Sequence, residues 1–177
     1  MPPETPVPGS PADWLRHAYS DLALASIMPV PQILLEQLCF HAQQAAEKAL
    51  KAILVAHGIA APRTHNIRTL FDLLPTDVSV PSDILDAAGL SDYAVASRYP
   101  GTSEPVEDEE YREAIHMAEA VIFWAEKVID LRLQDATDFS PMAEEDFEMR
   151  ARRGERSKFE AATAKVPDVE PEEGDRL

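Results

Sequence analysis

The sequence is poor in the residues that build cross-links and phosphate-binding loops. It has one cysteine, Cys39, so no disulfide can form within the chain and no cysteine-based metal cluster is possible. With only 6 glycines it has no Gly-rich phosphate loop, and it contains no nucleophile-elbow pattern. His57 and His65 are too far apart to form a metal pair on one helix. We therefore expect no metal, no cofactor and no common hydrolase chemistry.

Long hydrophobic segments are also absent. No run approaches the roughly 20 apolar residues that cross a bilayer. The N-terminus, Met1-Pro2-Pro3-Glu4, lacks the basic and apolar regions of a signal peptide. Together with the single cysteine, these absences predict a soluble, cytoplasmic protein that does not contact a membrane.

Positive charge is scarce. Lys and Arg number 16 against 32 Asp and Glu, which gives a net charge of −16. Because nucleic-acid affinity comes mainly from basic side chains at phosphates, we expect no DNA-wide binding, and any nucleotide or RNA contact must be a small local site. The densest acidic run, residues 107–110, is typical of a solvated helix N-terminus; a surface for a basic partner or a metal is the alternative.

The length and the hydrophobic content of the chain are sufficient for one domain. The chain has 177 residues, of which 45% are hydrophobic, enough for one real core and too few to favour two domains. Residues 1–9 hold four prolines and are predicted to form a disordered leader. Residues 10–136 are predicted to form a helical bundle, and residues 137–177 an acidic extension that is part helix and part disordered.

Hydrophobic periodicity indicates helices throughout the bundle and no strand. The fold class is therefore all-α: an up-and-down bundle of four to five helices with an extra C-terminal helix or tail. The expected helices cover residues 11–27, 32–57, 66–75, 82–97 with a break near Gly89, and 106–135. The extra helix would lie within residues 140–164.

The second expected helix carries two distinct faces. Small residues at Ala42, Ala45, Ala46 and Ala49 suit close packing within the chain or in a homodimer. His41, Gln44, Lys48 and Lys51 follow at spacings of three and four, which places them together. One interpretation is structural: Glu47 and Lys51 form a surface pair, and Gln43 and Gln44 make contacts at a helix or dimer interface. The other is a groove that accepts a phosphate or a base.

Two further segments carry candidate ligand residues. Arg63 and His65 precede a helix start, where a histidine either caps and packs or helps to hold an anion. Arg98 and Tyr99 precede Pro100. Arg98 either bonds the carbonyl end of its own helix or contacts a phosphate, and Tyr99 either packs or stacks on a base.

These residues also resemble a known family. The pattern His-x-Gln-Gln-Ala-x-Glu-Lys-x-Leu-Lys over residues 41–51 resembles the second helix of HEPN domains (higher eukaryotes and prokaryotes nucleotide-binding). Further matches occur in the same order, so that the resemblance covers about residues 12–130; they are Trp14, Asp21-Leu22, Thr64-His65-Asn66, Leu70 and Arg98-Tyr99-Pro100. The resemblance implies a homodimer that binds a nucleotide or RNA and regulates a minimal nucleotidyltransferase in a toxin-antitoxin-like pair.

Many HEPN proteins are metal-independent ribonucleases, and this is the alternative function. Their motif is an Arg, four to six residues, and a His near the start of the last core helix, where Arg stabilises phosphate charge and His moves a proton. Here Arg112 and His116 are separated by only three residues, which departs from that motif, although both lie on one helix face. The second alternative is a structural adaptor that binds only protein.

Overall fold

A computed structural model gives the structure of the protein and describes residues 5–96 and 104–138. These residues form helices and contain no strand, which confirms the all-α fold class. Contacts divide the chain into residues 1–135 and 136–177, and the description below concerns the first of these units. Two candidate ligand residues, Arg98 and Tyr99, lie outside the described residues. So do residues 1–4 of the predicted leader and residues 139–177 of the predicted extension.

The first helix, α1 (Pro11–Ala25), begins as its sequence predicts. The Ser10 hydroxyl accepts a hydrogen bond from the Asp13 amide at 3.2 Å, and Pro11 fills the first turn. The Asp13 carboxylate accepts in turn from the Gly9 amide at 2.9 Å, one residue earlier than a capping box would reach. The helix ends at Ala25, two residues before the predicted end.

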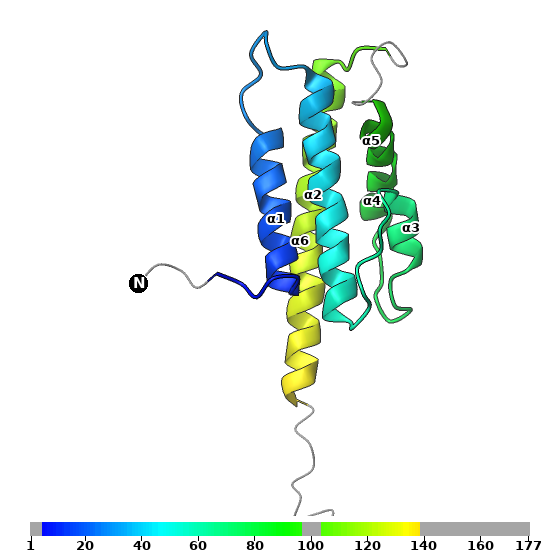
Figure 1. Ribbon diagram of the computed structural model, residues 1–177. Helices are drawn as coiled ribbons and strands as arrows, with labels where there is room; N and C mark the ends of the chain where they lie inside the picture. Colours follow the sequence, from blue (N-terminus) through cyan, green and yellow to red (C-terminus); the bar gives the residue numbers. More distant parts are fainter. Residues whose placement is uncertain (1–4, 97–103, 139–177) are drawn as a thin grey trace, which may run out of the picture. The chain divides into compact units, whose positions relative to one another are not determined.

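The second helix, α2 (Leu35–Ala56), is the most buried element of the bundle. It starts three residues later than predicted, because residues 31–34 form a turn. Its small residues Ala42, Ala45, Ala46 and Ala49 are fully buried within a single chain. α1 packs along α2 over most of its length (Figure 1). The small face therefore serves intrachain packing, the first of the two alternatives.

Gly58 ends α2 in the left-handed conformation, with φ of 75°. Its amide donates to the Val55 carbonyl at 3.0 Å, and the Ile59 amide donates to the Leu54 carbonyl at 2.9 Å. This pair of hydrogen bonds is a Schellman motif, which needs a residue that tolerates positive φ.

We expect Gly58→Ala to lower the free energy of unfolding by about 1 kcal/mol. A Cβ at this position would meet no atom within 4 Å, so the cost comes from the backbone conformation alone. Gly89→Ala is the matched control, since that position is equally open but has no positive φ; it should be neutral or slightly stabilising. Urea titration of both variants measures the difference, and equal stabilities would contradict it.

Short helices follow α2. Asn66 caps α3 (Ile67–Asp72) as predicted, its side-chain oxygen accepting from the Thr69 amide at 3.0 Å. After a loop come α4 (Ser82–Leu85), the 3₁₀ helix η1 (Asp86–Asp92) and α5 (Tyr93–Ala96). The α-helix is interrupted near Gly89 as predicted, and the interruption is the 3₁₀ helix η1 rather than an irregular break.

The last helix, α6 (Asp108–Asp138), runs beside α1 and α2 (Figure 1). Its inward stripe matches the predicted period, with the following residues buried: Tyr111, Ala114, Ala118, Val121, Ile122, Ala125 and Ile129. Glu107, Asp108, Glu109 and Glu110 are exposed at its start, as a solvated N-terminus requires. In the described residues, no helix combines the length and apolar character needed to span a membrane.

Candidate functional site

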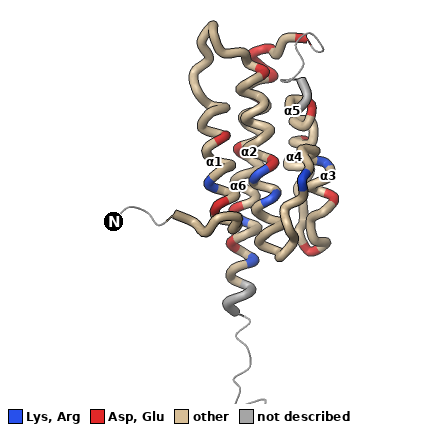
Figure 2. Tube along the Cα trace, viewed as in Figure 1, with Lys and Arg blue, Asp and Glu red and all other residues tan. Residues whose placement is uncertain are grey.

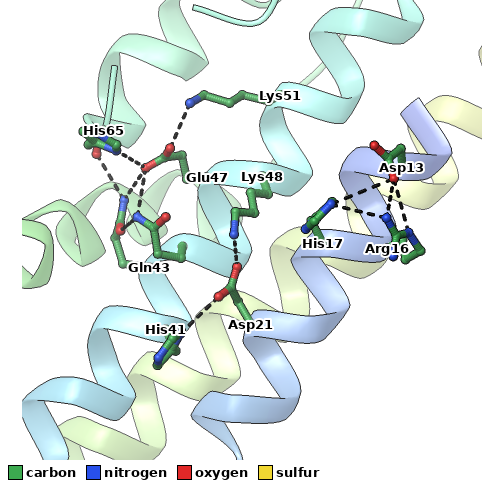
Figure 3. Close-up of polar contacts among 11 residues, drawn as sticks. Asp13, Arg16, His17, Asp21, His41, Gln43, Glu47, Lys48, Lys51 and His65 are labelled. Carbon is green, nitrogen blue, oxygen red and sulfur yellow. Dashed lines mark hydrogen bonds and ion pairs between the residues drawn. The ribbon is translucent and has the colours of Figure 1, made fainter. Parts of the chain in front are cut away.

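Asp21 of α1 brings two basic residues of α2 together. Its Oδ1 lies 3.0 Å from His41 Nδ1, and its Oδ2 accepts from Lys48 Nζ (Figure 3). The Asp21 side chain is largely buried, whereas those of His41 and Lys48 are partly exposed. We call these three residues the Asp21 cluster. Asp21 fixes the positions of both basic groups and leaves part of each accessible to solvent.

Glu47, one turn before Lys51, forms the centre of a second cluster. Its carboxylate accepts from Lys51 Nζ at 2.8 Å and from Gln43 Nε2 at 2.9 Å, and it lies 3.2 Å from His65 Nδ1. Gln43 also donates to the His65 carbonyl at 3.1 Å, and Gln44 donates to the Gln43 side-chain oxygen at 2.7 Å. These five residues, Gln43, Gln44, Glu47, Lys51 and His65, are called the Glu47 cluster (Figure 3).

The pairing of Glu47 with Lys51 was predicted correctly, but its placement on the surface was wrong. The two side chains are only 3% and 7% exposed. The segment leading to α3 covers Glu47, and Lys51 Nζ lies 5.6 Å from the ring centre of Trp14 on α1. Two buried opposite charges can share such a site because they are paired with each other, and no buried polar side-chain atom of the described residues lacks a hydrogen-bond partner.

The predicted ligand residues of α2 thus divide between the two clusters. His41 and Lys48 belong to the Asp21 cluster, and Gln44 and Lys51 belong to the Glu47 cluster. Lys48 is 23% exposed and His65, from the segment before α3, is 56% exposed. Solvent therefore reaches Lys48, His41 and His65 more readily than Lys51. Asp21, Gln43 and Glu47, which hold these residues in place, were not assigned this role from the sequence.

Charge is distributed unevenly between the two halves of the bundle. Residues 5–72, which contain α1, α2 and α3, hold five Lys or Arg and five Asp or Glu. The described residues from 73 onward hold three and fifteen. Figure 2 shows the basic residues of the first part on α1, on α2 and around α3, and α2 packs against both α1 and α3. In this part of the chain the acidic residues do not outnumber the basic ones.

The Arg112 and His116 pair has a different setting. Both side chains are exposed on α6. Arg112 Nη1 donates to Glu109 Oε2 at 2.6 Å, so its guanidinium is engaged by an acidic neighbour one turn earlier on the same helix. Glu113 lies close by, in the wall of a pocket of about 170 Å³ between η1 and α6. The surroundings of this pair are acidic.

Cys39 lies inside the bundle, where its thiol stays protonated. Burial raises the pKa of its thiol to about 12, and the carboxylates of Glu110 and Glu36 add to the rise. Tyr93 lies beside it and donates to Glu110 Oε1 at 2.6 Å. Because only the thiolate is nucleophilic, we assign no reactive role to Cys39.

We expect Cys39 to react with a thiol reagent at pH 8 at least about a hundredfold more slowly in the folded protein than in urea. The unfolded thiol ionises near pH 9, while the folded thiol keeps its proton. The free energy of unfolding should therefore decrease as the pH rises from about 9 toward 12. Cys39 is the only cysteine, so the labelling signal is unambiguous; rapid stoichiometric labelling of the folded protein would contradict this result.

Among the described residues, no group of His, Cys, Asp and Glu side chains is arranged to hold a metal ion. The two clusters instead offer ammonium and ring N–H groups, which suit an oxyanion.

Comparison with known proteins agrees with this architecture. The family model described as "HEPN domain" matches residues 11–128. Protein TT1696 from Thermus thermophilus is 33% identical, with a TM-score of 0.58, and the match covers 68% of this chain and 98% of that protein. ST0689, described as an archaeal HEPN homologue, is 32% identical, with a TM-score of 0.54 and the same coverage. No curated protein matches the sequence. The region that the family model matches contains both clusters, the helices from α1 to α5 and most of α6. The chain therefore belongs to the HEPN domain family.

Proposed function

We propose that this HEPN domain binds a nucleotide or a short RNA through a phosphate, and regulates a minimal nucleotidyltransferase in a toxin-antitoxin-like pair. The phosphate would bind beside Lys48 and His41 of the Asp21 cluster, with His65 of the Glu47 cluster at the edge of the site. The observation that carries the proposal is the charge distribution: partly exposed basic groups lie in the one half of the described bundle whose Lys and Arg balance its Asp and Glu.

The two clusters suit this role in different ways. Lys48 and His41 have exposed edges that can reach a phosphate oxygen, while Asp21 holds them in place. Lys51 is buried against Glu47, so it would contribute mainly to the position of His65 through that carboxylate. Arg98 and Tyr99, outside the described residues, remain proposed contacts for a phosphate and a base. The partner enzyme is proposed on the strength of family membership.

Equilibrium titration with ATP, GTP and a short single-stranded RNA tests the proposal. We expect one site per chain, with an affinity that falls as salt rises, because the contact is to phosphate. Co-purification with the product of an adjacent nucleotidyltransferase gene tests the partner. If none of the three ligands binds at low salt, the proposed ligand class is wrong.

A metal-independent ribonuclease is the alternative that uses Arg112 and His116. The engagement of Arg112 by Glu109 and the acidic surroundings weigh against it. Incubation with RNA in chelator decides between the two functions. We expect no cleavage; cleavage that disappears in His116→Ala would establish the alternative. Deletion of residues 139–177 tests the adaptor function. If the protein is an adaptor, the deletion should abolish its assembly with a protein partner. If it binds a nucleotide as proposed, the deletion should leave the nucleotide affinity unchanged.

We also propose a homodimer formed through the outer face of α6. Phe123 and Leu131 are exposed on this helix, and Lys127 Nζ lies 4.1 Å from the Phe123 ring centre. Paired copies would cover these apolar side chains. Light scattering should report a dimer for the natural protein and a monomer for Phe123→Ser; a natural protein that is monomeric at high concentration would exclude the homodimer.

A further inference from the structure

We propose that the end of the bundle where α1 connects to α2 is a docking surface for a partner protein segment that combines apolar and basic side chains. The surface consists of Ile27, Met28, Val30 and Leu34, which we call the apolar tip. It is independent of the proposed phosphate site, whose residues lie in the middle of α2 and before α3.

The side chains of the apolar tip are exposed to solvent although they are all apolar. Met28 is 84% exposed and Leu34 is 61% exposed, and Ile27 and Val30 are also exposed. Single exposed apolar residues are common, but four within eight consecutive residues of one loop are a concentration of apolar side chains that favours an interaction site. Pro29 and Pro31 separate them and stiffen the backbone. The chain therefore presents these side chains on a restrained loop.

Contacts with α6 hold this loop in position. The buried Tyr111 hydroxyl donates to the Ala25 carbonyl at 2.8 Å and lies 3.3 Å from the Ile27 carbonyl. Within the loop, the Ile33 amide donates to the Val30 carbonyl at 2.9 Å. Because the backbone on both sides of Met28 is fixed, a partner would not need to order the loop on binding.

Acidic residues border the apolar tip and indicate the chemistry of its partner. The Val106 amide lies 3.4 Å from Glu36 Oε1, which places the start of α6 against the start of α2. Glu107 and Asp108 are exposed there. Figure 2 shows this acidic segment at the same end of the bundle as the connection between α1 and α2. An apolar patch with an acidic border complements an apolar segment flanked by Lys or Arg. It repels an anionic membrane surface.

A fluorescent amphipathic peptide of Leu and Lys, with Leu on one helical face, serves as the probe. We expect it to bind the full chain, and Met28→Ser/Leu34→Ser to weaken binding about tenfold or more. Glu107→Gln/Asp108→Asn should weaken binding and reduce its dependence on salt. A peptide of Ser and Lys and one of Leu and Glu should both bind poorly. All four substituted side chains are exposed, so the variants should fold; circular dichroism checks this.

Two variants match these changes elsewhere on the bundle. Leu73→Ser removes an exposed apolar residue of the loop after α3, and Glu119→Gln removes an exposed charge of α6; both should bind the probe like the natural protein. The proposal is overturned if the tip variant binds the Leu-Lys peptide as well as the natural protein does. It is also overturned if vesicles with anionic lipid bind through the tip, or if the tip variant only converts a dimer into a monomer. Nucleotide affinity at moderate salt, where long-range charge effects are screened, should be the same in all these variants.

Discussion

Replacing Glu47 with alanine is expected to lower the free energy of unfolding by about 3 kcal/mol. The substitution leaves the buried Lys51 ammonium without its 2.8 Å partner. It also removes the acceptor of the Gln43 amide and the group that lies beside His65. An uncompensated buried charge costs more than the lost packing of one carboxylate.

Urea denaturation followed by circular dichroism measures this effect. Glu119→Ala, an exposed Glu on α6, should change the free energy of unfolding by no more than about 0.5 kcal/mol. The double variant Glu47→Ala/Lys51→Met should recover much of the lost stability, because it removes both charges. A Glu47→Ala protein as stable as Glu119→Ala would show that the Glu47 cluster does not hold α2 to the segment before α3.

Lys48→Ala should weaken nucleotide binding by about tenfold or more, which corresponds to at least about 1.4 kcal/mol. Lys48 supplies a partly exposed ammonium, and it lies in residues 5–72, where Lys and Arg are as many as Asp and Glu. Removing Lys48 also leaves the negative charge of the Asp21 carboxylate less compensated, so that this carboxylate repels the phosphate more strongly. The lost attraction and the added repulsion both weaken binding.

Arg132→Ala is the matched control for this change. It removes the same charge from an exposed position on α6, so long-range attraction changes equally in both variants while the local contact is lost in only one. Titration at low and moderate salt separates the two effects, since the long-range part is screened. Equal affinities of the two variants would mean that Lys48 makes no direct contact with the ligand.

The helices were predictable because local patterns determine them. Asn66, Ser10 and Gly58 mark ends of helices through their own backbone chemistry. The inward residues of α6 repeat at the period of a helix, which one sequence suffices to show. Where turn geometry competes with periodicity, the prediction failed: α2 begins at Leu35 rather than at residue 32. The interruption near Gly89 was predictable, but its 3₁₀ geometry was not.

The site was only partly predictable, because its key contacts join distant residues. The spacing of Glu47 and Lys51 indicates a pair, but exposed and buried pairs have the same spacing in a sequence. What buries this pair is the approach of His65 and Trp14 from other elements. Likewise, Asp21 belongs to the family pattern on α1, yet its contacts with His41 and Lys48 become visible only when α1 packs on α2.

Binding of a phosphate ligand beside the Asp21 and Glu47 clusters can be located on the natural protein by backbone amide spectra recorded during a titration with ATP. We expect the largest shifts on residues 41–51 of α2 and on residues 63–68 before and within α3. Shifts confined to residues 109–116 of α6, around Arg112 and His116, would contradict it and place the ligand at the alternative ribonuclease site.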